Sequence, residues 1–170
     1  MPGRLYSAAG DGYFESHDYG QTWRRSTAAL LRHHGYLFGL AVDSGNPQTI
    51  IVSASQWARQ AHFLEAAESV VYRRTTTSSE KKNADHDDTD KEEEWKLVSN
   101  GLPKPTGTLI SILAANPKIA GAFYAVNNHG IFYSTDSGIS WKMLNDYNGI
   151  EWPKKYLSQH PRALAVTEYT

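Results

Sequence analysis

The same eight-residue pattern occurs twice in this chain of 170 residues, and it constrains the fold more than any other feature. Residues 16–23 read S-x-D-x-G-x-T-W and residues 134–141 read S-x-D-x-G-x-S-W; we call them the first and second box turns. Each follows a short apolar run that begins with glycine, at 12–15 and 130–133. Repetition of a motif together with its flanks indicates a repeated supersecondary unit rather than two unrelated hairpins.

Each box turn carries the residue types that a tight β-hairpin needs. The aspartate can accept hydrogen bonds from turn amides, and the glycine can adopt a positive φ. The tryptophan offers a large apolar body that can anchor the hairpin against its neighbours. The pattern therefore predicts that each box turn joins two antiparallel strands.

The two box turns resemble the Asp-box, or BNR, repeat of sialidases, xyloglucanases, sortilin-type receptors and photosystem assembly factors. In such proteins the repeat joins the third and fourth strands of a β-propeller blade, on the face away from the active site. The order of elements is most similar to bacterial BNR-repeat or WD40/YVTN/BNR-like proteins, often called glycosyl hydrolases. The resemblance implies a structural role for the box residues Ser16, Asp18, Gly20, Thr22, Trp23, Ser134, Asp136, Gly138, Ser140 and Trp141.

The expected fold is all-β, with β-propeller blades of four antiparallel strands and about three blades in this chain. We expect one blade at 4–25, which lacks its first strand, a second at 37–98 and a third at 109–144. Apolar runs at the start of the second and third blades indicate inner strands covered on both faces. The second blade lacks a box turn, and its charged segment 75–94 is expected to be a flexible insertion. Residues 162–168 are expected to form a closing strand for the first blade.

Three blades are fewer than the four or more that a propeller usually needs. The chain is then a half-propeller or fragment of a longer protein, a homodimer that completes a six-blade ring, or an open array. The open array is the least favoured, because it leaves blade faces uncovered.

Composition excludes several classes of function. The sequence has no cysteine, so disulfides and thiolate metal sites are excluded. A net charge of −1 gives no case for nucleic acid or for an anionic membrane surface as a partner. No apolar run approaches the roughly 20 residues of a membrane span, and no signal peptide is seen, so a soluble cytoplasmic protein is expected.

The ligand face of such a propeller carries the loops from strand two to strand three and from one blade to the next. Candidate ligand-binding residues on these loops combine carboxylate, imidazole, guanidinium and aromatic groups, which suit a carbohydrate or protein ligand. They are Asp11, His33, His34, Tyr36, Trp57, Arg59, His62 and His129, with Asn127, Trp152, Tyr156 and His160 as further members.

No catalytic set is complete on this face. A glycosidase of the inverting or retaining kind needs two carboxylates, and only Asp11, a weak candidate, is placed there. The adjacent His33 and His34 would point to opposite faces of a strand, and the acidic residues of 78–94 lack the spacing of a calcium loop, so no metal or cofactor is expected. The favoured interpretation is a non-catalytic module that binds a protein or small ligand. The alternative is a glycoside hydrolase of the sialidase or xyloglucanase type.

Overall fold

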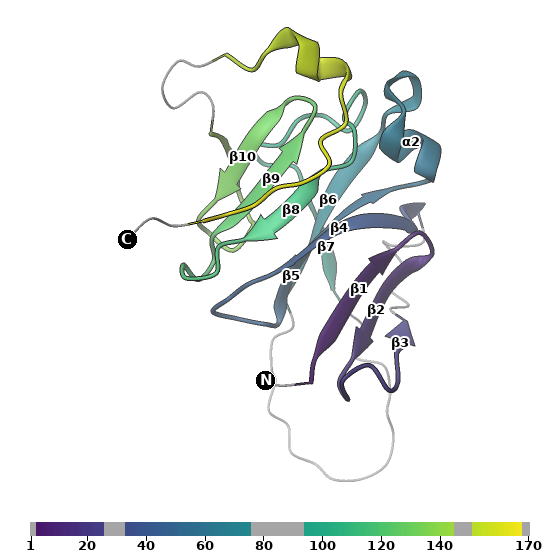
Figure 1. The fold of residues 1–170 in the computed structure, drawn as a ribbon, viewed down its shortest axis with the longest axis vertical. Coiled ribbons are helices and arrows are strands. Elements are labelled where there is room, and N and C mark those ends of the chain that lie inside the picture. The colour runs from purple at the N-terminus through teal and green to yellow at the C-terminus, as the bar shows by residue number, and fades with distance from the viewer. Residues whose placement is uncertain (1–2, 26–32, 76–93, 145–150, 168–170) are drawn as a thin grey trace.

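The computed structural model describes residues 3–25, 33–75, 94–144 and 151–167, and its fold is all-β. The described strands form three antiparallel sheets (Figure 1). The first sheet has the order β1-β2-β3, the middle sheet β4-β5-β6-β7 and the third sheet β8-β9-β10-β11. Their bounds are β1 Leu5–Ala9, β2 Gly12–Ser16, β3 Arg24–Arg25, β4 Tyr36–Val42, β5 Thr49–Ser55, β6 Ser69–Thr75, β7 Trp95–Val98, β8 Ile112–Ala115, β9 Phe123–Asn127, β10 Gly130–Ser134 and β11 Lys142–Met143.

The middle sheet lies between the other two and is covered on both faces. All seven residues of β5 are buried. Ile50 and Val52 pack into a core shared with Tyr13 of the first sheet, whereas Ile51 packs into a core shared with Phe123 of the third sheet. Successive residues of a strand point to opposite faces, so a continuous apolar run is what a doubly covered strand requires.

The first strand of the middle sheet, β4, contacts both β1 and β8. Gly39 makes the approach to the third sheet possible, because a Cβ atom there would lie 2.7 Å from the carbonyl oxygen of Ser111. The pairing of β4 with β5 shifts register between Leu37 and Leu40, a bulge at the same point. A bulge commonly changes the direction in which nearby side chains point, and this one contains Phe38, which is exposed.

An ion pair holds the first sheet to the middle sheet. Arg74 is almost completely buried, pairs with the carboxylate of Glu15, and donates a hydrogen bond of 3.1 Å to the Tyr13 hydroxyl. Its guanidinium also lies over the rings of Tyr13 and Trp95, 5.0 and 5.3 Å from their centroids. Burial raises the pKa of Glu15, but hydrogen bonds from Tyr13 and its neighbours and the charge of Arg74 outweigh it and leave that pKa below its usual range.

The two box turns share most of their internal hydrogen bonds, and Asp136 accepts one more, from the Ile139 amide at 3.1 Å. In the first, Asp18 Oδ1 accepts from the Thr22 amide at 2.9 Å and Asp18 Oδ2 from the Thr22 hydroxyl at 2.6 Å. In the second, Asp136 accepts the same pair of bonds from Ser140, at 2.9 and 2.5 Å. The box serines accept from the glycine amides, at 2.8 Å for Gly20 and 3.0 Å for Gly138. These turns therefore close through their own side chains.

Short helices lie in the segments that connect or follow the strands. The loop from β5 to β6 holds the helix α2 (Ala58–His62) and the 3-10 turn η1 (Leu64–Ala66). A further 3-10 turn, η3 (Lys154–Ser158), precedes the C-terminal segment. Except at its two ends, the expected flexible insertion 75–94 lies outside the described residues.

Residues 162–168 were expected to form a closing strand for the first blade, and their described part, 162–167, is not a strand. It runs as coil after η3, crossing the third sheet in the view of Figure 1, and belongs to none of the three described sheets. A strand is stabilised by a ladder partner, and this segment pairs with none of the described strands. The first sheet accordingly has three strands where the other two have four.

Candidate functional site

Three of the expected ligand-face residues meet in one place, at the helical side of the middle sheet. Strand β4 carries Tyr36 and Phe38, α2 ends at His62, and the C-terminal segment brings His160 beside them. A pocket at this point, which we call the aromatic groove, is lined by Phe38, His62, Phe63, His160 and Arg162.

Hydrogen bonds link the two imidazoles to Tyr36 and to the backbone. The Pro161 carbonyl can only accept, so His160 Nδ1 donates to it at 2.6 Å. His160 Nε2 lies 2.9 Å from His62 Nδ1, and His62 Nε2 lies 2.7 Å from the Tyr36 hydroxyl. When His62 is neutral, one of its ring nitrogens donates and the other accepts.

The surroundings of His62 favour that neutral form. Burial lowers the pKa of His62, and the neighbouring His160 and Arg162 lower it further. Phe38 lies edge-on to the His62 ring, with 5.0 Å between centroids, and His62 and His160 lie 4.8 Å apart. The rings therefore hold one another in place as one aromatic cluster.

The groove presents apolar rings to solvent. Phe63 is 56% exposed and Phe38 43% exposed, and Trp57 on the nearby loop is more exposed still. The lining residues include the guanidinium of Arg162 and no carboxylate. Such a surface can hold an apolar or aromatic group beside an anionic one, and it offers no acid–base pair for hydrolysis.

A second group of loop residues, which includes the expected Asn127, His129 and Trp152, mostly forms hydrogen bonds with backbone groups. The Asn128 side chain accepts from the Leu109 amide and donates to the carbonyls of Gly107 and Leu157, at 2.9, 3.0 and 3.0 Å. Trp152 donates to the Asn128 carbonyl at 2.7 Å. The ring of His129 lies 3.1 Å from the Gly107 carbonyl. These contacts fasten the loops together, and Asn127 is buried rather than at the surface.

The remaining candidates lie outside the groove. Asp11 is exposed, and its carbonyl accepts from Arg25. His33 is exposed, and His34 lies 2.7 Å from the Tyr72 hydroxyl, with its pKa lowered chiefly by burial. Arg59 lies 3.9 Å from Glu65 in an exposed ion pair.

Two carboxylates of the described chain form their contacts outside the groove. Glu15 pairs with Arg74, and buried Asp43 accepts from the amides of Gly45 and Gly121, both at 2.9 Å. Over residues 3–25, 33–75, 94–144 and 151–167, no three side chains of histidine, aspartate or glutamate gather where they could hold a metal ion.

Sequence reasoning missed Phe38, Phe63 and Arg162. Phe38 sits within an apolar run that predicted burial on both faces, and the bulge in β4 turns it outward instead. Phe63 and Arg162 carry no local pattern that marks a site. Only the meeting of α2 with the C-terminal segment gives them a common pocket.

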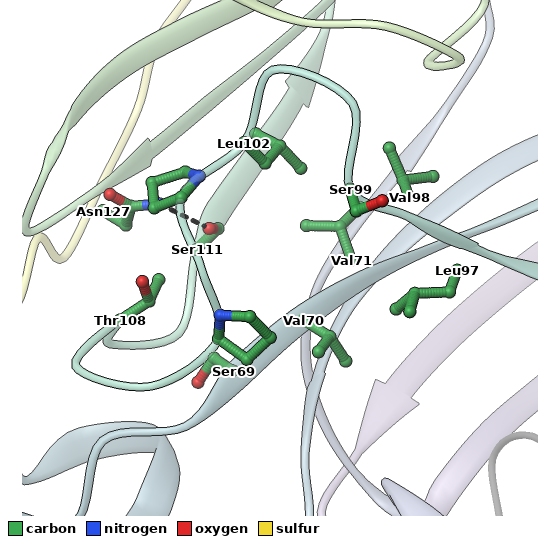
Figure 2. Close-up of a pocket in the computed structure, with 12 residues that line it drawn as sticks. Ser69, Val70, Val71, Leu97, Val98, Ser99, Leu102, Thr108, Ser111 and Asn127 are labelled. Carbon is green, nitrogen blue, oxygen red and sulfur yellow. Dashed lines mark hydrogen bonds between the residues drawn. The ribbon is translucent and has the colours of Figure 1, made fainter.

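Another cavity lies between the middle and third sheets (Figure 2). Val70, Val71 and Val98 line one side, and Ser111 and Asn127 the other, where Asn127 donates to the Ser111 hydroxyl at 3.2 Å. Its volume of about 40 Å³ suits about three water molecules, since one water needs roughly 10–15 Å³ by the same measure. The cavity is therefore part of the packing between blades and not a ligand site.

Comparison with known proteins places the fold in the β-propeller class. No protein-family model matches the chain, and no curated protein matches it. A solved structure of YCF48 bound to D1 peptide, a β-propeller protein, is similar with a TM-score of 0.52 and 15% sequence identity. The similarity covers 85% of this chain and 37% of that one, so this chain spans little more than a third of the length of YCF48.

The three sheets are thus blades of a partial β-propeller. At this level of identity the similarity concerns the fold alone. In the described residues, no helix has the length and apolar character that crossing a membrane requires.

Proposed function

We propose that this chain is a non-catalytic propeller module that binds an extended segment of a partner protein in the aromatic groove. One observation carries the proposal: the groove offers exposed aromatic rings and a guanidinium, and its lining residues include no carboxylate. Aromatic residues, phenylalanine included, and arginine are enriched at protein interfaces relative to the rest of the protein surface.

The arrangement favours a peptide with an aromatic or aliphatic anchor next to an acidic group. Phe63 and Phe38 supply apolar area that the described chain leaves open to solvent, and Arg162 supplies a positive charge at its edge. The ring cluster of Phe38, His62 and His160 is already ordered, so binding would lose little side-chain entropy there. YCF48, which shares the fold, was solved bound to a peptide; this fits a protein ligand without identifying one.

The test is to pan a phage library of random dodecapeptides against the full chain and to measure the affinity of enriched peptides by calorimetry. We expect enriched sequences that pair an aromatic with an acidic residue, and a loss of at least tenfold in affinity on Phe63→Ala. Ile139→Ala is the matched control, because Ile139 is as exposed as Phe63 but lies in the second box turn. Peptides that bind wild type and Phe63→Ala equally well would overturn the proposal.

The glycosidase alternative makes a different prediction for the same purified protein. A sialidase or xyloglucanase would release the dye from aryl glycosides or sialosides, and Asp11→Asn would abolish that activity. We expect no turnover by the wild type on such a panel. Turnover that Asp11→Asn removes would replace our proposal with the glycosidase.

A further inference from the structure

A second pocket, which we call the tryptophan pocket, lies next to the aromatic groove. It forms where η3 and the segment after it lie over the third sheet (Figure 1). Strand β9 contributes Val126 to its lining, and the C-terminal segment contributes Trp152, Tyr156, Gln159, His160 and Pro161. Because His160 also lines the aromatic groove, the two pockets are neighbours that share one side chain.

The tryptophan pocket has the size and the lining of a site for one apolar side chain. Its volume is about 190 Å³, and an apolar cavity of roughly 150 Å³ can hold a benzene molecule. The rings of Trp152 and Tyr156, with 5.3 Å between their centroids, are half-buried, and the described chain leaves the pocket open to solvent. One aromatic or aliphatic side chain therefore fits against these two rings.

Hydrogen bonds hold the lining of the tryptophan pocket in place. Trp152 Nε1 donates to the Asn128 carbonyl at 2.7 Å, which satisfies its N–H group and leaves its ring for apolar contact. The amides of Tyr156 and Gln159 donate to the carbonyls of Pro153 and Tyr156, at 2.8 and 3.0 Å. A site that is ordered in this way loses less entropy when a ligand binds.

His160 separates the two pockets and is itself held by hydrogen bonds. Its Nδ1 donates to the Pro161 carbonyl at 2.6 Å, and its Nε2 lies 2.9 Å from His62 Nδ1. Both ring nitrogens are engaged, so a ligand that uses both pockets has to pass over this ring. An extended chain can do so, because its alternate side chains point to the same face.

The charge around the two pockets favours an acidic ligand. The lining residues of both pockets include no carboxylate. Segment 151–167 carries three basic side chains, Lys154, Lys155 and Arg162, and one acidic side chain, Glu151. Lys155 Nζ lies 5.1 Å from the centroid of the Tyr156 ring, and Arg162 lines the groove. A cation therefore lies beside each pocket, and complementary charge selects the partner that binds there.

We propose that one extended, acidic segment of a partner protein places one apolar side chain in the aromatic groove and a second in the tryptophan pocket. This inference rests on the proposed function of the groove and adds a second anchor site to it. Tryptophan and tyrosine, which line the new site, are among the residues that contribute most binding energy at interfaces. The preferred ligand has two apolar anchors two or four positions apart, with an acidic residue between or next to them.

The test measures, by calorimetry, the affinity of the dodecapeptides enriched on the full chain. We expect two apolar residues at that spacing. Tyr156→Ala should weaken binding about tenfold, because it removes one ring of the pocket, whereas Tyr156→Phe should bind like the wild type. Leu157→Ala is the matched control and should leave the affinity unchanged, because Leu157 is exposed in the same 3-10 turn and lines neither pocket.

Double-mutant cycles then assign each peptide anchor to one pocket. The loss on Tyr156→Ala should vanish for a peptide that lacks one anchor, and the loss on Phe63→Ala for a peptide that lacks the other. Far-UV circular dichroism checks that each variant is folded. Gln159→Glu keeps the shape of an exposed lining residue and adds a negative charge, so it should also weaken binding, and it replaces Tyr156→Ala if that variant is unfolded.

The outcomes separate this inference from the proposed function. If Phe63→Ala weakens binding and the variants of the tryptophan pocket do not, the groove remains the binding site and the second anchor site is wrong. If Phe63→Ala has no effect either, both proposals fail. If a segment of this same chain fills the pocket, Tyr156→Ala will lower the urea midpoint without changing the peptide affinity, which also overturns the inference.

Discussion

The first and second box turns of this propeller segment are nearly identical inside and differ in what surrounds them. Tyr19 and Ser137 both have φ of 62°, and the glycines that follow have φ of 86° and 81°. The tryptophan of the second turn is buried against the middle sheet, whereas that of the first is nearly half exposed. Local hydrogen bonds therefore build the turn, and a neighbouring blade decides how much stability its apolar residues contribute.

Replacing the two tryptophans should give the largest difference between the turns. Trp141→Ala should lower the free energy of unfolding by about 3–5 kcal/mol, because it empties a packed position between two sheets. Trp23→Ala should cost about 1 kcal/mol in the monomer, because much of its surface is already in water. Urea unfolding at low concentration, where any dimer dissociates, measures both. Equal losses would mean that burial against the middle sheet does not stabilise the second turn.

Replacing the two aspartates should affect the turns alike. Asp136→Ala should lower the free energy of unfolding by about 1–3 kcal/mol, since turn amides lose their acceptor. Asp18→Ala should shift the urea midpoint in the same direction and by a similar margin, because Asp18 accepts the same pair of hydrogen bonds from Thr22 that Asp136 accepts from Ser140. Asp→Asn at each position, which retains one acceptor oxygen, should fall between wild type and alanine. If Asp18→Ala left the urea midpoint unchanged, the first turn would not depend on its carboxylate for stability.

The smallest difference between the two box turns is expected in the pKa values of their aspartates, Asp18 and Asp136. Hydrogen bonds from the Thr22 hydroxyl and amide lower the pKa of Asp18 from 3.8 to about 2. Burial raises the pKa of Asp136, but the Ser140 hydroxyl and amide outweigh it and bring it also to about 2. Below pH 3.8 the unfolded chain binds protons that the folded chain does not, so stability should fall as the pH drops from about 3.8 to about 2.

Carbon-detected NMR titration of the two side-chain carboxyls measures these values directly. Values that differ by more than one unit would mean that the blade packed on the second turn, and not the turn itself, sets the charge of the aspartate. The double variant Asp18→Asn/Asp136→Asn is the control for the stability measurement, because its stability should respond less to pH in this range.

Phe38 and the C-terminal segment show where sequence reasoning fails. An apolar run predicted that β4 is buried on both faces. Its residues are buried or half-buried except Phe38, which lies at the bulge and is exposed. Residues 162–167 have the composition of an inner strand and form none, since a strand needs a partner that local sequence does not supply. The candidate list contained His62, and His160 as a further member, but nothing in their spacing indicated that their rings lie 4.8 Å apart.

The sequence by itself determined the repeating unit: two box turns, the apolar inner strands and the all-β class. These depend on short-range chemistry, in which an aspartate, a glycine and a serine satisfy the amides of one turn. The tertiary structure decided the rest, because burial is a property of pairs of sheets. It buried Trp141 and exposed Trp23, and it joined α2 to the C-terminal segment to form the aromatic groove.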